Sequence, residues 1–389
     1  MDEPAHRAGM ARTDPRVVAE QAAAVAAAWS PPGAPASWAL TAAQLQTLRD
    51  DDELLAIAAL NEPGRLPALL FQAAATHLVL ELEPEPLRDW FPRLGHPQPT
   101  LGPGFADAYR SFCLEHRGRL IELCGRHRYQ MNEVARSADL LAALAPAIAA
   151  GRPLALIDIG TGAGLALHLD RYRYVFTGPG RHVTMIGDPS SDVVIRTEVR
   201  GERRAPLEPE LPRIAARVGI DIEPLELNDP AVRSWLAACV PQEIGAVTRF
   251  HHAVEVARSR PVPLVQGDVL AALPGVLAEI ADDVLVCLVD SYVHVFFDSD
   301  ELQRFRTFVD ELGRRRDLDW ISVDPLIPMG VDANASVVGA PVPGSLLRRN
   351  QAGAVFGVVA RVSYRDGART TTLLGIAHPS GAWLEWLEP

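Results

Sequence analysis

Over the first 150 residues, apolar side chains recur at the three- and four-residue spacing of amphipathic helices. The Ala-rich run at residues 14–29 opens with Asp14, an acid suited to capping a helix N-terminus. The same spacing predicts helices over residues 41–60, 66–82, 105–127 and 132–150, with proline-rich joints between them. We therefore predict an all-helical N-terminal domain over residues 1–150.

The pattern changes after Pro153. Residues 154–159 form a short, largely apolar run typical of a buried strand, and residues 165–176 continue as a predicted helix. Two segments of alternating apolar and polar residues then flank the turn-forming run 187–192. They predict an inserted β-hairpin near residues 182–201.

Strand-like and helix-like runs alternate beyond this point. Further strands are predicted over residues 216–227, 262–268, 283–291 and 318–325, and the first three are each followed by a helical run. The segments 354–364 and 368–378 flank an Arg-Asp-Gly turn and predict a terminal antiparallel hairpin. The fold class expected for residues 151–389 is therefore α/β, a Rossmann-like parallel sheet that ends in this hairpin. Its site should lie at the carboxyl ends of the strands, beside the first one.

The run Asp-Ile-Gly-Thr-Gly-Ala-Gly at residues 158–164 follows the first predicted strand. Glycines let a backbone approach a ligand closely, but the dinucleotide fingerprint needs a further glycine where this chain has Leu165. A carboxylate at Asp158 would repel a pyrophosphate and attract the ammonium group of an amino acid. This favours S-adenosylmethionine over NAD, with a bare glycine turn as the alternative. The expected cofactor residues are Asp158, Gly160, Thr161, Gly162 and Gly164.

Acids follow the later strands as well. Asp221 or Glu223 is expected to accept the ribose hydroxyls, with Asp188 as the runner-up, and Asp268 is expected to meet the adenine amine. A helix N-cap is the alternative role for each of these acids and for Asp290 after the fourth strand.

The fourth strand of this series ends in the residues best suited to chemistry. His294 has the intrinsic pKa of a general base, Asp290 could orient an acceptor, and Tyr292 could cover the adenine or the substrate. A packed core histidine is the alternative reading of His294. Asp324, after the fifth strand, is a candidate substrate residue. No metal is expected, although convergence of Asp290 and Asp324 would permit a metal-dependent variant.

Residues 132–136 form a second candidate region. In a helix, Asn132 and Arg136 would share one face with Glu133 beside them, and that face could form a polar lid that reads the substrate. The alternative is a helix cap at Asn132 with a surface pair between Glu133 and Arg136.

Composition excludes several classes of function. The chain has no lysine, so its 37 basic residues are all arginines, which rules out Schiff-base chemistry and a P-loop. A net charge of -12 argues against nucleic acid as a partner. Four widely spaced cysteines suit a reduced, cytoplasmic protein, and we expect neither a signal peptide nor a membrane partner. Oligomeric state is not readable from the sequence.

Several motifs resemble an actinobacterial family known as domain of unknown function 2332. They are the glycine run with its flanks, "RVGIDIEPLELNDPAVRSWLAACV", "VQGDVLAALP", "NEVARSADLL" and the terminal "GAWLEWL". This uncharacterised family in turn looks like class I methyltransferases with a helical N-terminal addition. The chain departs from it at Val289-Asp290, where the family often has Phe-His, and at Ser322-Val323-Asp324, where it often has Ser-Asn-Glu.

Together these features predict a methyltransferase that uses S-adenosylmethionine on a small-molecule metabolite. A non-catalytic protein of the same fold, acting as a sensor or scaffold, is the first alternative. An NAD-type oxidoreductase is the second, and Leu165 disfavours it.

Overall fold

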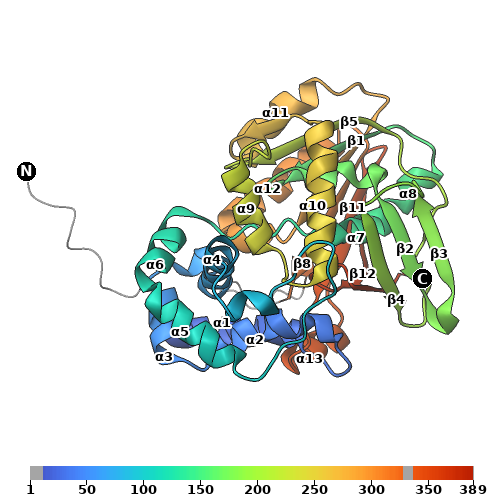
Figure 1. Cartoon of the computed structure of the whole chain (residues 1–389). Coiled ribbons are helices and arrows are strands. Elements are labelled where there is room, and N and C mark those ends of the chain that lie inside the picture. Colours follow the sequence, from blue (N-terminus) through green and yellow to red (C-terminus); the bar gives the residue numbers. More distant parts are fainter. Residues whose placement is uncertain (1–11, 327–335, 389) are drawn as a thin grey trace, which may run out of the picture. The chain divides into compact units, whose positions relative to one another are not determined.

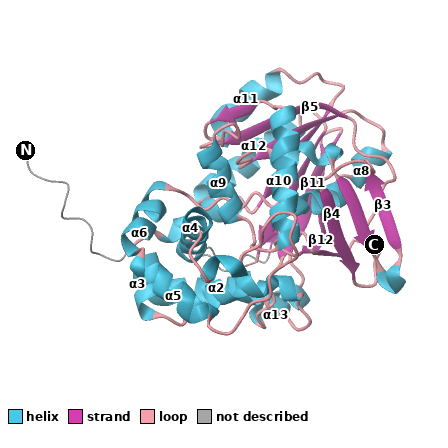
Figure 2. Cartoon of the chain, viewed as in Figure 1, coloured by secondary structure: helices cyan, strands magenta, loops and turns pink. Residues whose placement is uncertain are grey.

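The structure is a computed structural model that describes residues 12–326 and 336–388. The described chain forms two compact units (Figure 1). The helical unit comprises residues 12–132 and Asp229–Thr248, and the sheet unit comprises Glu133–Asn228 and the described residues from Arg249 onward. The predicted helical stretch 132–150 thus lies, from Glu133 on, in the sheet unit. Figure 2 shows that helices make up one unit and that the strands gather in the other.

The helical unit confirms the predicted helices and subdivides two of them. Asp14 caps the first helix by accepting a hydrogen bond from the Arg16 N–H. The helix predicted over residues 41–60 breaks at Asp51, whose carboxylate accepts from the Leu54 N–H and starts a new helix. The helices are α1 (Pro15–Trp29), α2 (Ala39–Arg49), α3 (Asp52–Ala58), α4 (Pro67–Leu82), α5 (Phe105–Glu115), α6 (Arg117–Arg126) and α9 (Pro230–Cys239).

The helix α9 was expected to cross over within the α/β part of the chain, but it packs against α4 in the helical unit. The indole N–H of Trp235 donates to the Arg128 carbonyl, and its ring stacks on His127 at 4.2 Å between centroids. The buried face of α9 therefore packs against α4 of the helical unit. The helix α10 (Ile244–Ser259) follows it.

The sheet unit is built on one eleven-stranded sheet of order β3-β2-β4-β13-β12-β11-β8-β7-β1-β5-β6. Its first strand, β1, is buried at every position and pairs in parallel with β5 on one side and β7 on the other. The parallel run β6-β5-β1-β7-β8 places the carboxyl ends of these strands at one edge. The strands of this run are β1 (Leu154–Ile159), β5 (Ile214–Asp221), β6 (Leu264–Gln266), β7 (Leu285–Ser291) and β8 (Leu318–Pro325).

The secondary structure and strand pairing of residues 165–201 differ from the sequence-based prediction. A short 3-10 helix, Leu165–Arg171, replaces most of the predicted helix, and the strand β2 (Arg173–Thr177) follows it. The side chains of Tyr172, Tyr174 and Phe176 are buried, because their spacing of two fits a strand. The predicted hairpin is wrong in its pairing: β3 (Val183–Gly187) and β4 (Val194–Arg200) flank β2, antiparallel and parallel respectively.

The C-terminal hairpin is confirmed. Its strands β11 (Gly357–Arg365) and β12 (Ala368–Ala377) pair antiparallel, and β11 also lies antiparallel to β8. The last strand, β13 (Trp383–Trp386), pairs with β12 and with β4, so it joins the two halves of the sheet. The remaining elements are α7 (Ser137–Ala143), α8 (Ala145–Ala149), α11 (Val269–Ala278), α12 (Ser299–Gly313), α13 (Gly344–Gln351) and the two-residue strands β9 (Ser336–Val337) and β10 (Ala340–Pro341).

The four cysteines are free and buried. Among the described residues, no helix combines the length and the apolar character needed to cross a bilayer.

Candidate functional site

The predicted glycine loop follows β1 directly. Gly160, Gly162 and Gly164 all have φ between 56° and 73°, the left-handed region that favours glycine. The N–H groups of Gly160 and Thr161 donate to the carbonyl of Ile220, which fixes the loop against the end of β5. The run after Gly164 is a kinked 3-10 helix and not the predicted α-helix. The N–H groups of Gly162 and Gly164 donate to Asp221 and to the carbonyl of Thr161, so hydrogen bonds within the protein hold the loop in place.

Replacing Gly160 with alanine is expected to destabilise the protein by about 2–4 kcal/mol. The added Cβ would pay for its positive φ, about 1 kcal/mol, and would also lie 2.5 Å from Cγ2 of Val293. Gly151→Ala is the matched control, since Gly151 has the same φ of 67° and nothing within 4 Å of an added Cβ. Urea unfolding should show the larger loss only at Gly160, and adding Val293→Ala should recover part of it. Equal losses at the two glycines would contradict the close approach.

Asp158 is the acid beside this loop. Its carboxylate is 6% exposed and accepts a hydrogen bond of 2.7 Å from the Thr161 hydroxyl. Burial raises the pKa of Asp158 to about 7; the Thr161 hydrogen bond opposes the rise, and the carboxylates of Asp290 and Asp221 add to it. A buried acid of this kind is stabilised in its charged form by a nearby cation.

The other predicted cofactor acids fall into different positions. Asp221, at the end of β5, accepts hydrogen bonds from the N–H groups of Gly162 and Glu223, at 2.8 and 2.9 Å. Glu223 is exposed. Asp268 has the helix-capping role that was the alternative prediction for it: its carboxylate accepts hydrogen bonds from the N–H groups of Leu270 and Ala271 at the start of α11. Asp188 lies in a turn and accepts from Ser190. Of these acids, Asp221 is thus the one that a hydrogen bond joins to the glycine loop.

A buried polar cluster occupies the carboxyl ends of β7 and β8. Asp290 accepts a hydrogen bond of 2.6 Å from the indole N–H of Trp320. The Ser322 hydroxyl lies 2.7 Å from Oδ1 of Asp290 and 2.8 Å from Oδ2 of Asp324. The ring of His294 sits between the two carboxylates, with Nδ1 in contact with Asp324 and Nε2 3.5 Å from Asp290 Oδ1. We call Asp290, His294, Ser322 and Asp324 the β7–β8 cluster.

The charge state of His294 follows from this setting. Burial alone would lower the pKa of His294, but the carboxylates of Asp290 and Asp324 raise it to about 10. The imidazole is therefore protonated near neutral pH in the absence of another cation, and it can donate hydrogen bonds. The role of general base predicted from its intrinsic pKa would require a neutral ring.

Tyr292 follows β7 with a positive φ of 61°, a strained conformation for a residue with a side chain. Its N–H donates to the carbonyl of Val323, and the guanidinium of Arg136 lies 4.0 Å from its ring centroid. Burial raises the pKa of the Tyr292 phenol, and its hydroxyl has no hydrogen-bond partner among the described residues. The guanidinium of Arg136 thus lies against the aromatic ring of Tyr292, a predicted catalytic residue.

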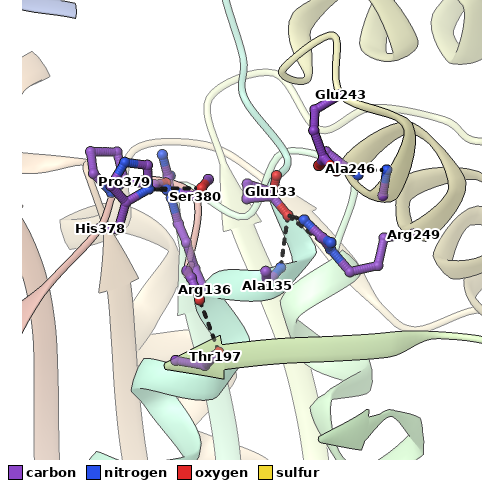
Figure 3. Close-up of polar contacts among 12 residues, drawn as sticks. Glu133, Ala135, Arg136, Thr197, Glu243, Ala246, Arg249, His378, Pro379 and Ser380 are labelled. Atoms are coloured by element: carbon purple, nitrogen blue, oxygen red, sulfur yellow. Dashed lines mark hydrogen bonds and ion pairs between the residues drawn. The ribbon is translucent and has the colours of Figure 1, made fainter. Parts of the chain in front are cut away.

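The segment at residues 132–136 does not form the predicted helical face. Glu133 caps a short 3-10 helix, Val134–Arg136, by accepting from the Ala135 N–H. The Asn132 side chain donates to the Gln130 carbonyl. Arg136 donates to the carbonyl of Pro379 at 2.7 Å (Figure 3).

Glu133 pairs with a residue that the sequence did not single out. Its Oε1 accepts from Arg249 at 3.0 Å, and the two side chains are only 2% and 15% exposed (Figure 3). The expected surface pair between Glu133 and Arg136 is therefore replaced by a buried pair with Arg249. No local pattern identified Arg249, because it lies 116 residues away along the chain.

Trp320 and Ser322 were also missed, although the sequence carried a signal for them. Trp320, Ser322 and Asp324 alternate along β8 and therefore share one face of that strand. Ser322 stands opposite Asp290 in the parallel register of β7 and β8. The convergence of Asp290 and Asp324 that the sequence suggested is thus present, through the hydroxyl of Ser322.

These features define a mixed α/β protein with a large central sheet, mostly parallel around β1 and compatible with a Rossmann-like fold. Its candidate site lies at the carboxyl ends of β1, β5, β7 and β8. The chain belongs to the DUF2332 family, uncharacterized proteins conserved in bacteria, whose family model matches residues 17–386. The family indicated by the sequence motifs is thereby confirmed. No curated protein matches the chain.

Proposed function

We propose that this protein is an S-adenosylmethionine-dependent methyltransferase-like enzyme acting on a small-molecule metabolite. The observation that carries the proposal is the buried carboxylate of Asp158 beside the glycine loop of β1. From β1 the sheet extends through β5 to β6 on one side and through β7 to β8 on the other. Ligands of open α/β sheets bind at such a switch point, outside the carboxyl ends of the strands.

The chemistry of the donor set fits this cofactor. S-adenosylmethionine carries an ammonium group and a sulfonium, and a cation beside Asp158 would offset the cost of ionising that acid. Asp221 is the acid placed to accept ribose hydroxyls, and the next residue, Ile222, is 65% exposed and offers an apolar surface to a purine. When bound, the cofactor supplies an electrophilic methyl group.

The residues of the β7–β8 cluster and Tyr292 would hold the methyl acceptor. Positioning supplies much of the acceleration of a displacement reaction, so charged groups held by Trp320 and Ser322 suit that task. His294, protonated between its two carboxylates, would donate a hydrogen bond to the methyl acceptor rather than take a proton from it.

The same protonation state favours a second candidate, a non-catalytic sensor or scaffold that binds the cofactor. A neutral general base is lacking at His294 near neutral pH, so an acceptor that must lose a proton would need another base. A methyl-transfer assay with labelled cofactor across metabolite pools separates the two: transfer supports the enzyme, and binding without transfer supports the sensor.

Binding is tested by calorimetric titration with S-adenosylmethionine, its demethylated product and NAD. We expect the first two to bind, and Asp221→Asn to weaken them by about tenfold to a hundredfold, the value of a hydrogen bond to a charged group. Asp188→Asn is the matched control, because Asp188 is an exposed turn acid that contacts Ser190. Absence of binding by both sulfur compounds, or loss of binding only in the Asp188 variant, would refute the proposal.

A further inference from the structure

The imidazole of His294 is held in an unusual way within the β7–β8 cluster. Its side chain is 9% exposed, and Nδ1 contacts Asp324. The other nitrogen, Nε2, is buried and lacks a hydrogen-bond partner among the described residues. It faces Oδ1 of Asp290 at 3.5 Å, which is longer than a protein hydrogen bond. Nε2 of His294 and Oδ1 of Asp290 thus lie close together without a hydrogen bond between them.

That separation matches the spacing of two ligands around one metal ion. Bonds of ~2.0–2.1 Å from a tetrahedral ion place neighbouring ligand atoms about 3.3–3.4 Å apart. One ligand atom each from Asp290, His294 and Asp324 lies within 4.8 Å of the others. The remaining oxygen of Asp324, Oδ1, is buried and has no hydrogen-bond partner in the described part of the chain, which makes it available as a third ligand.

The surroundings have the character of an outer coordination shell. Carboxylates that bind a metal are usually held by hydrogen bonds of their own, and Trp320 and Ser322 supply such bonds to Asp290. Trp320 donates to Oδ2 of Asp290 and so orients its Oδ1 toward His294. The Ser322 hydroxyl lies within hydrogen-bond distance of a carboxylate oxygen of each aspartate and thereby links Asp290 to Asp324.

Arg306 interacts electrostatically with Asp324, yet within the described residues it makes no hydrogen bond to either carboxylate, and its Nε is buried without a partner. The ring of His294 is the basic side chain that lies within 4 Å of both carboxylates.

We propose that Asp290, His294 and Asp324 bind one divalent transition-metal ion, of the Zn²⁺ or Mn²⁺ kind. An imidazole ligand among carboxylates favours these ions over Mg²⁺ and Ca²⁺, which take all-oxygen sites. The site goes beyond the proposed methyl transfer and does not depend on it, because it is formed by side chains at the ends of β7 and β8 alone.

The test is titration of the chelator-treated full chain with Zn²⁺ and Mn²⁺ in the absence of S-adenosylmethionine, by calorimetry and electron paramagnetic resonance. We expect one ion per chain. His294→Gln and Asp290→Asn should each abolish saturable binding, and Asp324→Asn should weaken it by at least about tenfold. Asp319→Asn is the matched control: Asp319 is a buried acid of the same strand whose partner is Arg365.

Substitution with Co²⁺ gives a second readout that needs only the wild-type chain. Ligand-field bands of one bound Co²⁺ with nitrogen and oxygen ligands would support the assignment, and their absence would contradict it. Wild-type chain without saturable binding of either ion, or binding that survives in both His294→Gln and Asp290→Asn, overturns it. Cofactor binding is measured separately, so failure of the metal site and failure of the proposed function give different results.

Discussion

Replacing Arg249 with methionine is expected to destabilise the protein by about 3–5 kcal/mol, since it leaves the Glu133 carboxylate buried without its cation. Glu133 is 2% exposed at its side chain, and its Oε1 accepts from both the Ala135 N–H and the guanidinium of Arg249. Its Oε2 is buried with no hydrogen-bond partner among the described residues. The loss would therefore reflect an uncompensated charge, and urea unfolding followed by circular dichroism measures it.

Two further variants distinguish this cause from a general effect of losing an arginine. Glu133→Gln removes the charge, so the double variant Glu133→Gln/Arg249→Met should be more stable than Arg249→Met alone. Arg258→Met is the control on the same helix, because Arg258 pairs with Glu255 at the surface and should change stability by less than about 1 kcal/mol. A double variant as unstable as Arg249→Met would show that the buried charge is not responsible.

Replacing Asp158 with asparagine is expected to stabilise the protein at pH 8, by about 2–4 kcal/mol, and to have little effect at pH 4. Burial raises the pKa of Asp158 from its ordinary 3.8 to about 7 in the folded chain. The folded state therefore holds this proton more tightly than the unfolded state. That contribution to stability is fully present below pH 3.8 and is lost as the pH rises through about 7. A rise from 3.8 to about 7 corresponds to a penalty on the order of 4 kcal/mol on the ionised form.

Thermal unfolding of both proteins between pH 4 and pH 8 measures this difference. Asp188→Asn is the control and should show no gain at pH 8, because Asp188 is exposed and hydrogen bonds from Ser190 lower its pKa. A wild-type chain whose stability relative to Asp158→Asn does not change with pH would contradict the buried setting. A buried acid such as Asp158 that lowers the free energy of unfolding is typical of a functional site, where a bound ligand can offset that loss.

Much of the site could be predicted because its residues stand at strand ends that local patterns reveal. The buried run before Gly160 and the glycines themselves identified the β1 loop, and positive φ at all three glycines fits that prediction. Asp221 was one of three candidates for the second acid, and its hydrogen bond to Gly162 now distinguishes it from Glu223 and Asp188. Such predictions succeed because a strand and the turn after it are determined by residues close together in the chain.

The pairing of strands could not be predicted in the same way. The alternation at residues 183–187 and 194–200 was read as one hairpin, yet β2 inserts between these two strands. Buried Tyr174 and Phe176 belong to a third strand that the sequence presented as the end of a helix. Alternation shows that a segment is a strand, but partner choice depends on which apolar faces the rest of the sheet covers.

The sequence by itself determined the α/β class, the glycine loop after β1 and the acids at the ends of β5, β7 and β8. Tertiary structure alone decided which side chains surround those acids. It brought Ser322 and Trp320 to Asp290, placed His294 between two carboxylates, and set Arg249 against Glu133. The physical reason is that pKa values and ion binding depend on burial and on neighbours distant in the chain, which no local pattern encodes.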